Sequence, residues 1–405
     1  MKPNKSKLTI LQQVCQLIPG HIVQKLANKH KIQTRSFSPW SHLVSMLYAQ
    51  LAHSISLNDI CDCLGNHSGA LKEIRDATAP RRNTLSYANK TRNADMAEEL
   101  FWEVLNGLQE KYPHFGINRK YSAFPQRFKR TIYAVDSTTI KLVANCLDWA
   151  KHRRRKAAAK CHMQLNLQSF LPNFALVKPA NTHDSTEAKE LCANIVSGEI
   201  VVFDKAYIDF KHLYHLDSRG VFWVSRSKDN MAYEVTEELN KAKGRIIRDQ
   251  KIILKNQLKR NDYPEVMRLI EAEVEIEGKV RNLVFITNNF EWAGQSIADI
   301  YKSRWGVEVF FKQVKQTLQI SDFLGHNENA IRWQVWTALL TYVLLRFLEF
   351  QSQWEHSFSR MFTVIRGVMW SYLNLFSVLE SCGTANAPPR RISAPPEQLL
   401  FNFSP

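Results

Sequence analysis

The clearest structural signal in the chain is the run IVVF at residues 200–203, which ends directly at an acid, Asp204. A short, continuous apolar run of this kind is typical of a strand that is buried on both faces of a sheet. A helical pattern at residues 185–196 precedes the run, and a β-branched stretch, TIYAVDSTTIKLV, stands upstream at residues 131–143. Strands that alternate with helices predict an α/β core, with Asp204 at the end of a buried strand.

Further strand and helix patterns surround this centre. Strand-like stretches lie at residues 162–167, 174–177, 221–224, 246–254, 266–277 and 283–286, and one long helical pattern covers residues 296–320. From residue 8 to about residue 108 the apolar residues recur at helical spacing instead. In this part Ser38 is expected to cap a helix that begins with Pro39, and Ser56 opens the next helix. The sequence therefore predicts an all-helical N-terminal region in front of the α/β core.

The composition is that of a basic globular protein. Of the 405 residues 45% are hydrophobic and 23% are charged, which argues against disorder and against a fibre. The formal net charge of +16 favours a polyanionic partner such as nucleic acid, although charge alone also fits a basic protein without one. Seven scattered cysteines predict reduced thiols in the cytoplasm. The N-terminus lacks the apolar segment of a signal peptide, and the most hydrophobic stretch, residues 335–345, is too short to cross a bilayer.

Three acids occupy positions where chemistry is expected. Asp136 lies within a predicted strand, Asp204 at the end of another, and Glu308 on the long predicted helix. Taken singly, each is more often a cap or a surface charge. Three converging carboxylates, however, need cations to neutralise them, and hard oxygen ligands suit Mg²⁺ or Mn²⁺. A site that holds two such ions promotes in-line displacement at phosphorus.

The predicted helix at residues 296–320 carries a polar stripe. At about 100° per residue, Tyr301, Arg304, Glu308 and Lys315 fall within an arc of about 60°, and Lys312 borders the same stripe. The spacing leaves two interpretations open. One is an Arg304–Glu308 ion pair on a solvated helix, worth roughly a few tenths of a kcal/mol. The other is a metal ligand flanked by phosphate-binding side chains.

The stripe resembles the Y-R-E-K signature of bacterial DDE transposases, in particular those of the insertion-sequence-four family. The stretch YKSRWGVEVFFKQVK at residues 301–315 carries it. Other stretches agree in order, namely YAVDSTTI with Asp136, KCHMQLNL, HDS, VVFDKAY with Asp204, FWVSRSKDN and FITNN. The stretch SFSPWSHLVSMLYAQLAHSISLNDI is similar to the helical domain that precedes the core in one branch of that family. The resemblance spans residues from about 8 to 350.

This resemblance implies an α/β fold with a ribonuclease H-like catalytic core and a mainly β insertion domain, preceded by an all-helical N-terminal domain. The implied division is a DNA-binding helical domain at residues 1–118, the core at 119–210 and 280–350, the insertion at 211–279, and a C-terminal segment at 351–405.

The implied function is that of a cut-and-paste DNA transposase of a bacterial insertion sequence. It would bind terminal inverted repeats and catalyse metal-dependent strand cleavage and strand transfer, with two Mg²⁺ or Mn²⁺ ions held by Asp136, Asp204 and Glu308. The expected partners are double-stranded DNA, at the transposon ends and at the target, and a second copy of the chain on DNA. No membrane partner is expected, and the expected location is the bacterial cytoplasm, at the nucleoid.

By the same resemblance, Tyr301, Arg304 and Lys315 hold phosphates at the transposon end, with Lys312 beside them. Trp223 or Trp292 is a candidate to stack on a flipped base, although a core position is the better interpretation of both.

Three arginines outside this helix are also expected to contact DNA. Arg226 matches a family motif in VSRSKDN. The basic run KHRRRK at residues 151–156, which includes Arg153 and Arg154, cannot pack in a core, and we expect it to contact the DNA backbone. Two rival functions stay open: an inactive or repurposed DNA-binding protein, and a metal-dependent nuclease without strand transfer. The complete set of three acids argues against the first.

Overall fold

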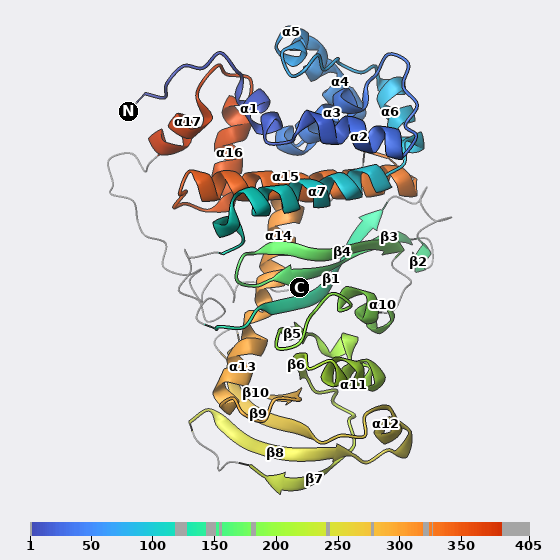
Figure 1. The fold of residues 1–405 in the computed structure, drawn as a ribbon, viewed down its shortest axis with the longest axis vertical. Helices are drawn as coiled ribbons and strands as arrows, with labels where there is room; N and C mark the ends of the chain where they lie inside the picture. The colour runs from blue at the N-terminus through green and yellow to red at the C-terminus, as the bar shows by residue number, and fades with distance from the viewer. Residues whose placement is uncertain are drawn as a thin grey trace. The chain divides into compact units, whose positions relative to one another are not determined.

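A computed structural model of the chain describes residues 2–117, 128–142, 151–153, 156–179, 184–239, 244–276, 279–318, 324–325 and 327–382. These residues form an α/β protein, with a helical N-terminal region followed by a mixed sheet (Figure 1). They divide into two compact units. The first comprises the described residues of Met1–Phe115, Ile140–Ala159 and Phe311–Ile392, and the second those of Gly116–Thr139 and Lys160–Phe310.

The N-terminal helices begin where the sequence supplies caps. The hydroxyl of Ser38 accepts a hydrogen bond from the backbone of Ser41 at the start of α3 (Pro39–Ala52), and Ser56 caps α4 (Leu57–Asn66) in the same way. Both predicted helix starts are therefore confirmed. The remaining helices of this region are α1 (Ile10–Gln16), α2 (Gly20–Lys29), α5 (Ser68–Lys72), α6 (Arg82–Thr91), α7 (Asp95–Lys111) and the 3₁₀ helix η1 (Pro113–Gly116).

The first unit is built around one long helix, α15 (Glu328–Gln351). It is buried on nearly every side and contacts α3, α6, α7 and α16 (Phe358–Val368). The indole of Trp333 donates a hydrogen bond of 2.7 Å to the carbonyl of Arg92, which ties α15 to the turn before α7. Most of its residues are apolar, which is typical of a helix in the interior of a domain. The unit also contains α17 (Leu375–Ser381). Among the described residues, no helix combines the length and the apolar character needed to span a membrane.

In the described part of the chain, the strands form one ten-stranded sheet, in the order β2-β3-β1-β5-β6-β10-β9-β8-β7, with β4 also paired to β3. β1, β5 and β6 are parallel neighbours, whereas β6, β10, β9, β8 and β7 pair in antiparallel fashion. Residues 211–279 supply β6 to β9, which continue this same sheet. The strand bounds are β1 (Ile132–Leu142), β2 (Lys151–Arg153), β3 (Lys156–Asn166), β4 (Leu171–Pro179), β5 (Ile200–Phe203), β6 (Phe222–Arg226), β7 (Tyr233–Glu238), β8 (Ile246–Leu254), β9 (Met267–Ile276) and β10 (Lys279–Thr287).

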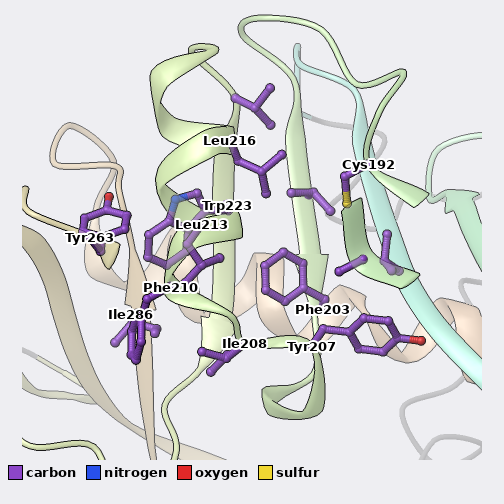
Figure 2. Packing of buried hydrophobic residues seen from close by; sticks show 14 of the residues in the cluster. Cys192, Phe203, Tyr207, Ile208, Phe210, Leu213, Leu216, Trp223, Tyr263 and Ile286 are labelled. Carbon is purple, nitrogen blue, oxygen red and sulfur yellow. The ribbon is translucent and has the colours of Figure 1, made fainter. Parts of the chain in front are cut away.

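The core of the second unit lies between this sheet and two helices, α10 (Asp184–Leu191) and α11 (Phe210–Ser218). Figure 2 shows Phe203 of β5 and Trp223 of β6 beside Leu213 and Leu216 of α11. Trp223 is fully buried in this cluster, as the interpretation of a core tryptophan predicted. A further short helix, α12 (Gln257–Asp262), contacts α11 and β8.

Candidate active site

The two candidate aspartates are placed side by side by the ladder between two parallel strands. Val135 of β1 pairs with Phe203 of β5. The next residue is an aspartate in both cases, Asp136 within β1 and Asp204 directly after the end of β5. Val135 and Phe203 fill the core beside α11. Because successive side chains of a strand point to opposite faces, Asp136 belongs to the face away from α11. The same face is covered by α13 (Gly294–Ser303), which contacts β5, β6 and β10.

Glu308 lies on α14 (Trp305–Thr317), and Arg304 stands between α13 and α14. The prediction of one continuous helix over residues 296–320 is therefore wrong at Arg304, and residues 319–320 lie outside the described part. The Arg304 backbone N–H donates to the carbonyl of Tyr301, and the Arg304 carbonyl accepts from Val307, both at 3.0 Å. These bonds between residues three apart tighten the turn and break the regular helical ladder. At this turn the Arg304 side chain reaches an acid on the sheet, Asp136.

The guanidinium of Arg304 joins two of the three candidate acids. Its Nη1 lies 2.7 Å from Oδ2 of Asp136, and its Nη2 lies 2.8 Å from Oε1 of Glu308. The Arg304 side chain is only 8% exposed, whereas those of Asp136 and Glu308 are 18% and 36% exposed. Burial works to lower the pKa of Arg304, but the charges of Asp136, Tyr301 and Glu308 raise it above its ordinary value. The arginine is thus a buried, permanently charged bridge.

The third acid, Asp204, contacts Tyr301 in the last turn of α13. The hydroxyl of Tyr301 donates a hydrogen bond to Oδ1 of Asp204 at 3.3 Å. Burial raises the pKa of Tyr301 to about 12, with Arg304 acting against the shift and Asp204 adding to it. The phenol therefore keeps its proton at neutral pH and remains a donor. Tyr301 also packs on Phe285 of β10, with ring centroids 5.0 Å apart, which anchors α13 to the sheet.

The surroundings of Glu308 raise the pKa of its carboxyl group above the ordinary value. Burial raises the pKa of Glu308, the Arg304 charge lowers it, and the charges of Asp136 and Asp204 raise it further. The two aspartates are therefore close enough to Glu308 to act on its charge. The close packing of α14 fixes this arrangement, because a Cβ added at Gly306 would stand 3.0 Å from a methyl carbon of Leu167.

Three acids from three elements thus converge on one small region that also contains Tyr301 and Arg304. The Arg304–Glu308 ion pair of the first interpretation forms, and Arg304 also reaches Asp136, which lies outside the helix. The interpretation of a metal ligand flanked by phosphate binders stays a prediction. Carboxylate oxygens are the ligands that hard divalent cations prefer. With Arg304 between Asp136 and Glu308, however, no three acid side chains among the described residues are close enough to share one ion.

The other residues that were predicted to contact DNA lie on different elements of the structure. Lys312 and Lys315 lie on the part of α14 that belongs to the first unit. Arg226 ends β6, where it is the next residue after Ser225, the partner of Phe203 on β5. Arg153 belongs to β2, but its side chain lies outside the described part, and so does the whole of Arg154.

One charged residue near Arg226 was not predicted from the sequence. Asp229 pairs with Lys205 at 2.8 Å and lies 3.9 Å from Arg226. Lys205 follows Asp204 directly, so this group borders the acid region. Its members come from different elements, and no periodic spacing marks them in the sequence.

Trp292, the other tryptophan considered for base stacking, is partly buried. Its ring packs against Phe128 and Phe222, with centroids 5.2 and 4.9 Å away. These contacts agree with a structural role in the second unit.

Comparisons with known proteins cover most of the described chain. Residues 127–344 match the family model of the transposase DDE domain, and residues 6–74 match a domain of unknown function, DUF4372. The "Probable transposase for insertion sequence element IS5377" of Geobacillus stearothermophilus is 28% identical over 58% of this chain and 61% of its own length. The transposase InsG of insertion sequence element IS4 of Escherichia coli is 23% identical over 54% of this chain and 48% of its own length.

The matched region therefore spans well under the full length of these two relatives. Among solved structures, a piggyBac transposase synaptic complex with hairpin DNA covers 95% of this chain and 86% of its own, with a TM-score of 0.46 and 8% identity. The family model alone covers more than half of the chain, including all three candidate acids. The chain belongs to the transposase DDE domain family.

Proposed function

We propose that the chain is a cut-and-paste DNA transposase of an insertion sequence, with Asp136, Asp204 and Glu308 as its catalytic acids. The observation that carries this proposal is the convergence of these acids, from two adjacent parallel strands and one helix, around Arg304 and Tyr301. The core around them would be ribonuclease H-like, at residues 119–210 and 280–350. Residues 1–118 would bind DNA, 211–279 would form the insertion, and 351–405 the C-terminal segment.

Membership of the DDE family implies the use of a divalent metal ion. The donor set fits such an ion, since Asp136 and Glu308 already share one cationic group and Asp204 lies beside them. Carboxylate oxygens are the ligands that Mg²⁺ and Mn²⁺ prefer, and we assign two ions to the three acids. When bound, these ions would stabilise the charge that develops at phosphorus and lower the pKa of the attacking oxygen.

The remaining side chains of the site would orient DNA. Tyr301 and Arg304 are donors beside the acids, and Arg304 has the planar fork that suits a phosphate. Lys312 and Lys315 on α14 would add positive charge along the same helix. Arg226, with Arg153 and Arg154 of the basic run, would contact the backbone of double-stranded DNA at the element's ends and at the target. Because two ends must be cut together, we expect a homodimer on DNA.

Cleavage by variants of each acid tests the proposal. D136N, D204N and E308Q are each expected to abolish Mg²⁺-dependent cutting of DNA that carries the terminal inverted repeats, while end binding stays within about twofold of the parent by gel shift. Asp299→Asn is the matched control, because Asp299 lies on α13 but bonds only to the exposed Gln295 among the contacts described. An acid variant that still cuts would remove that residue from the catalytic set.

Two further assays separate the rival functions. A plasmid excision assay with terminal repeats would show no excision if the chain only binds DNA. Pre-nicked ends incubated with target DNA would give no joined products if the chain is a nuclease without strand transfer.

A further inference from the structure

The guanidinium of Arg304 lies between two of the candidate acids, Asp136 and Glu308. Each terminal nitrogen of the guanidinium takes one carboxylate, Asp136 on the sheet side and Glu308 on the helix side. Its third nitrogen, Nε, has no hydrogen-bond partner among the described residues, although Arg304 is almost fully buried. A buried donor that stays unpaired is costly, so the position of Arg304 is set by the two acids rather than by a complete set of bonds.

The geometry of this bridge differs from that of a shared metal ion. The two carboxylates lie at hydrogen-bond length from two different nitrogens, at 2.7 and 2.8 Å. A Mg²⁺ ion instead takes its oxygen ligands at about 2.0–2.1 Å around one centre. In agreement with this spacing, no three His, Cys, Asp or Glu side chains of the described residues are grouped closely enough to hold one metal ion. An ion that bound both acids would therefore have to draw them together and displace the guanidinium between them.

The charges at the site also favour replacement of the guanidinium by a metal ion. Asp136 and Glu308 repel each other, since each is an anion in a partly buried site, and the single positive charge of Arg304 offsets this repulsion. A divalent cation would supply the same compensation from the same place. The guanidinium and the metal are thus alternatives for one position.

We propose that Arg304 is an internal competitor of the divalent cation, which binds Asp136 and Glu308 together only after the guanidinium has moved out from between them. This inference rests on the proposed function, because it takes the two acids as metal ligands. The turn at Arg304, where the helical ladder between α13 and α14 is interrupted, is the natural place for that movement. The chain would in this way resist loading its acid site with metal until Arg304 has found another partner.

A metal titration of the full chain, without DNA and without any activity assay, tests the proposal. Free Mn²⁺ is followed by electron paramagnetic resonance for the parent and for Arg304→Gln. The variant is expected to bind Mn²⁺ about tenfold more tightly, a change that corresponds to about 1.4 kcal/mol. A second variant, D136N with R304Q, is expected to lose this gain, because one of the two ligands is then missing.

The chain offers a matched control in Arg332, which also bridges two acids. One of its nitrogens lies 2.8 Å from Asp95 and 2.9 Å from Glu98, on helices of the first unit. R332Q frees two carboxylates just as R304Q does, but away from the proposed site, and it is expected to leave Mn²⁺ binding unchanged. An equal gain in R332Q would mean that any released acid pair attracts the ion, and it would overturn the assignment.

Two controls separate loss of folding and loss of DNA cutting from a change in Mn²⁺ binding. Circular dichroism checks that each variant is folded, and R304K serves where R304Q is not, since a lysine reaches only one acid as a point charge. R304K is expected to bind Mn²⁺ about threefold more tightly than the parent, or about 0.65 kcal/mol. Unchanged Mn²⁺ affinity in the folded Arg304 variant refutes the proposal. A tighter Mn²⁺ site in a chain that never cuts DNA would instead leave this inference standing and count against the transposase function.

Discussion

Acidification from pH 7 to pH 5 is expected to destabilise the first unit through one buried residue, His42 of α3. The imidazole is fully buried, and its Nε2 lies 2.7 Å from Oδ1 of Asn89. Its Nδ1 has no hydrogen-bond partner among the described residues. A second proton on this ring would therefore be buried without an acceptor. Burial and the nearby charge of Arg92 lower the pKa of His42 from 6.5 to about 3.

The sign of the effect follows from which state binds more protons. Below pH 6.5 the unfolded chain takes up a proton at His42, whereas the folded chain does so only near pH 3. Stability is therefore lost as the pH falls through the window between these two values. At about 1.36 kcal/mol per pH unit, the fall from pH 6.5 to pH 5 removes about 2 kcal/mol from the free energy of unfolding.

The assay is urea unfolding followed by tryptophan fluorescence at both pH values, for the parent and for His42→Gln. The variant is expected to be less stable at pH 7, because packing against Trp333 is lost, but to lose about 2 kcal/mol less on acidification. Burial also lowers the pKa of His212, to about 4, but His212 is present in both chains and cancels in the comparison. An equal acid-induced loss in the two chains would refute the reasoning.

Three further predictions concern stability and reactivity. Arg268→Met leaves the buried Asp249 without the partner now 2.7 Å away, and should cost about 3–5 kcal/mol in thermal unfolding; replacing Asp249 with Leu as well should recover most of it. Ser38→Ala removes the cap of α3 and should cost about 1 kcal/mol by urea unfolding, whereas Ser38→Asp should cost little. Burial raises the pKa of Cys192 to about 12, so iodoacetamide at neutral pH should modify the exposed Cys63 first by mass spectrometry, and both should react in urea.

Features that obey local rules could be predicted from the sequence. The apolar run at β5 with Asp204 at its end, and the serine caps of α3 and α4, depend on neighbouring residues only, and the structure has them where they were expected. Helix α11 was missed, although it supplies one side of the core, because its sequence FKHLYHLDS mixes polar and apolar residues. Its burial depends on strands that are distant in the chain.

In the candidate site, too, the features set by neighbouring residues could be predicted, whereas those set by distant residues could not. The helical stripe was visible from spacing, because Tyr301, Arg304 and Glu308 lie within two turns of one another. The break at Arg304 was not visible, and neither was the contact of its side chain with Asp136, 168 positions earlier in the chain. A helical wheel assumes an unbroken helix, so it could indicate which side chains share a face but not that one of them crosses to the sheet.

The ladder between β1 and β5 has a consequence for how the three acids can separate. Asp136 and Asp204 follow paired residues on adjacent strands, so parting them would require rupture of the central sheet. Glu308, by contrast, lies in the first turn of α14, which begins directly after the irregular turn at Arg304. We therefore expect slow amide exchange at Val135 and Phe203 and faster exchange in the first turn of α14, because the first N–H groups of a helix lack regular helical acceptors. Transient opening of the first turn of α14 would then move Glu308 away from the two aspartates, while the rest of the fold stays intact.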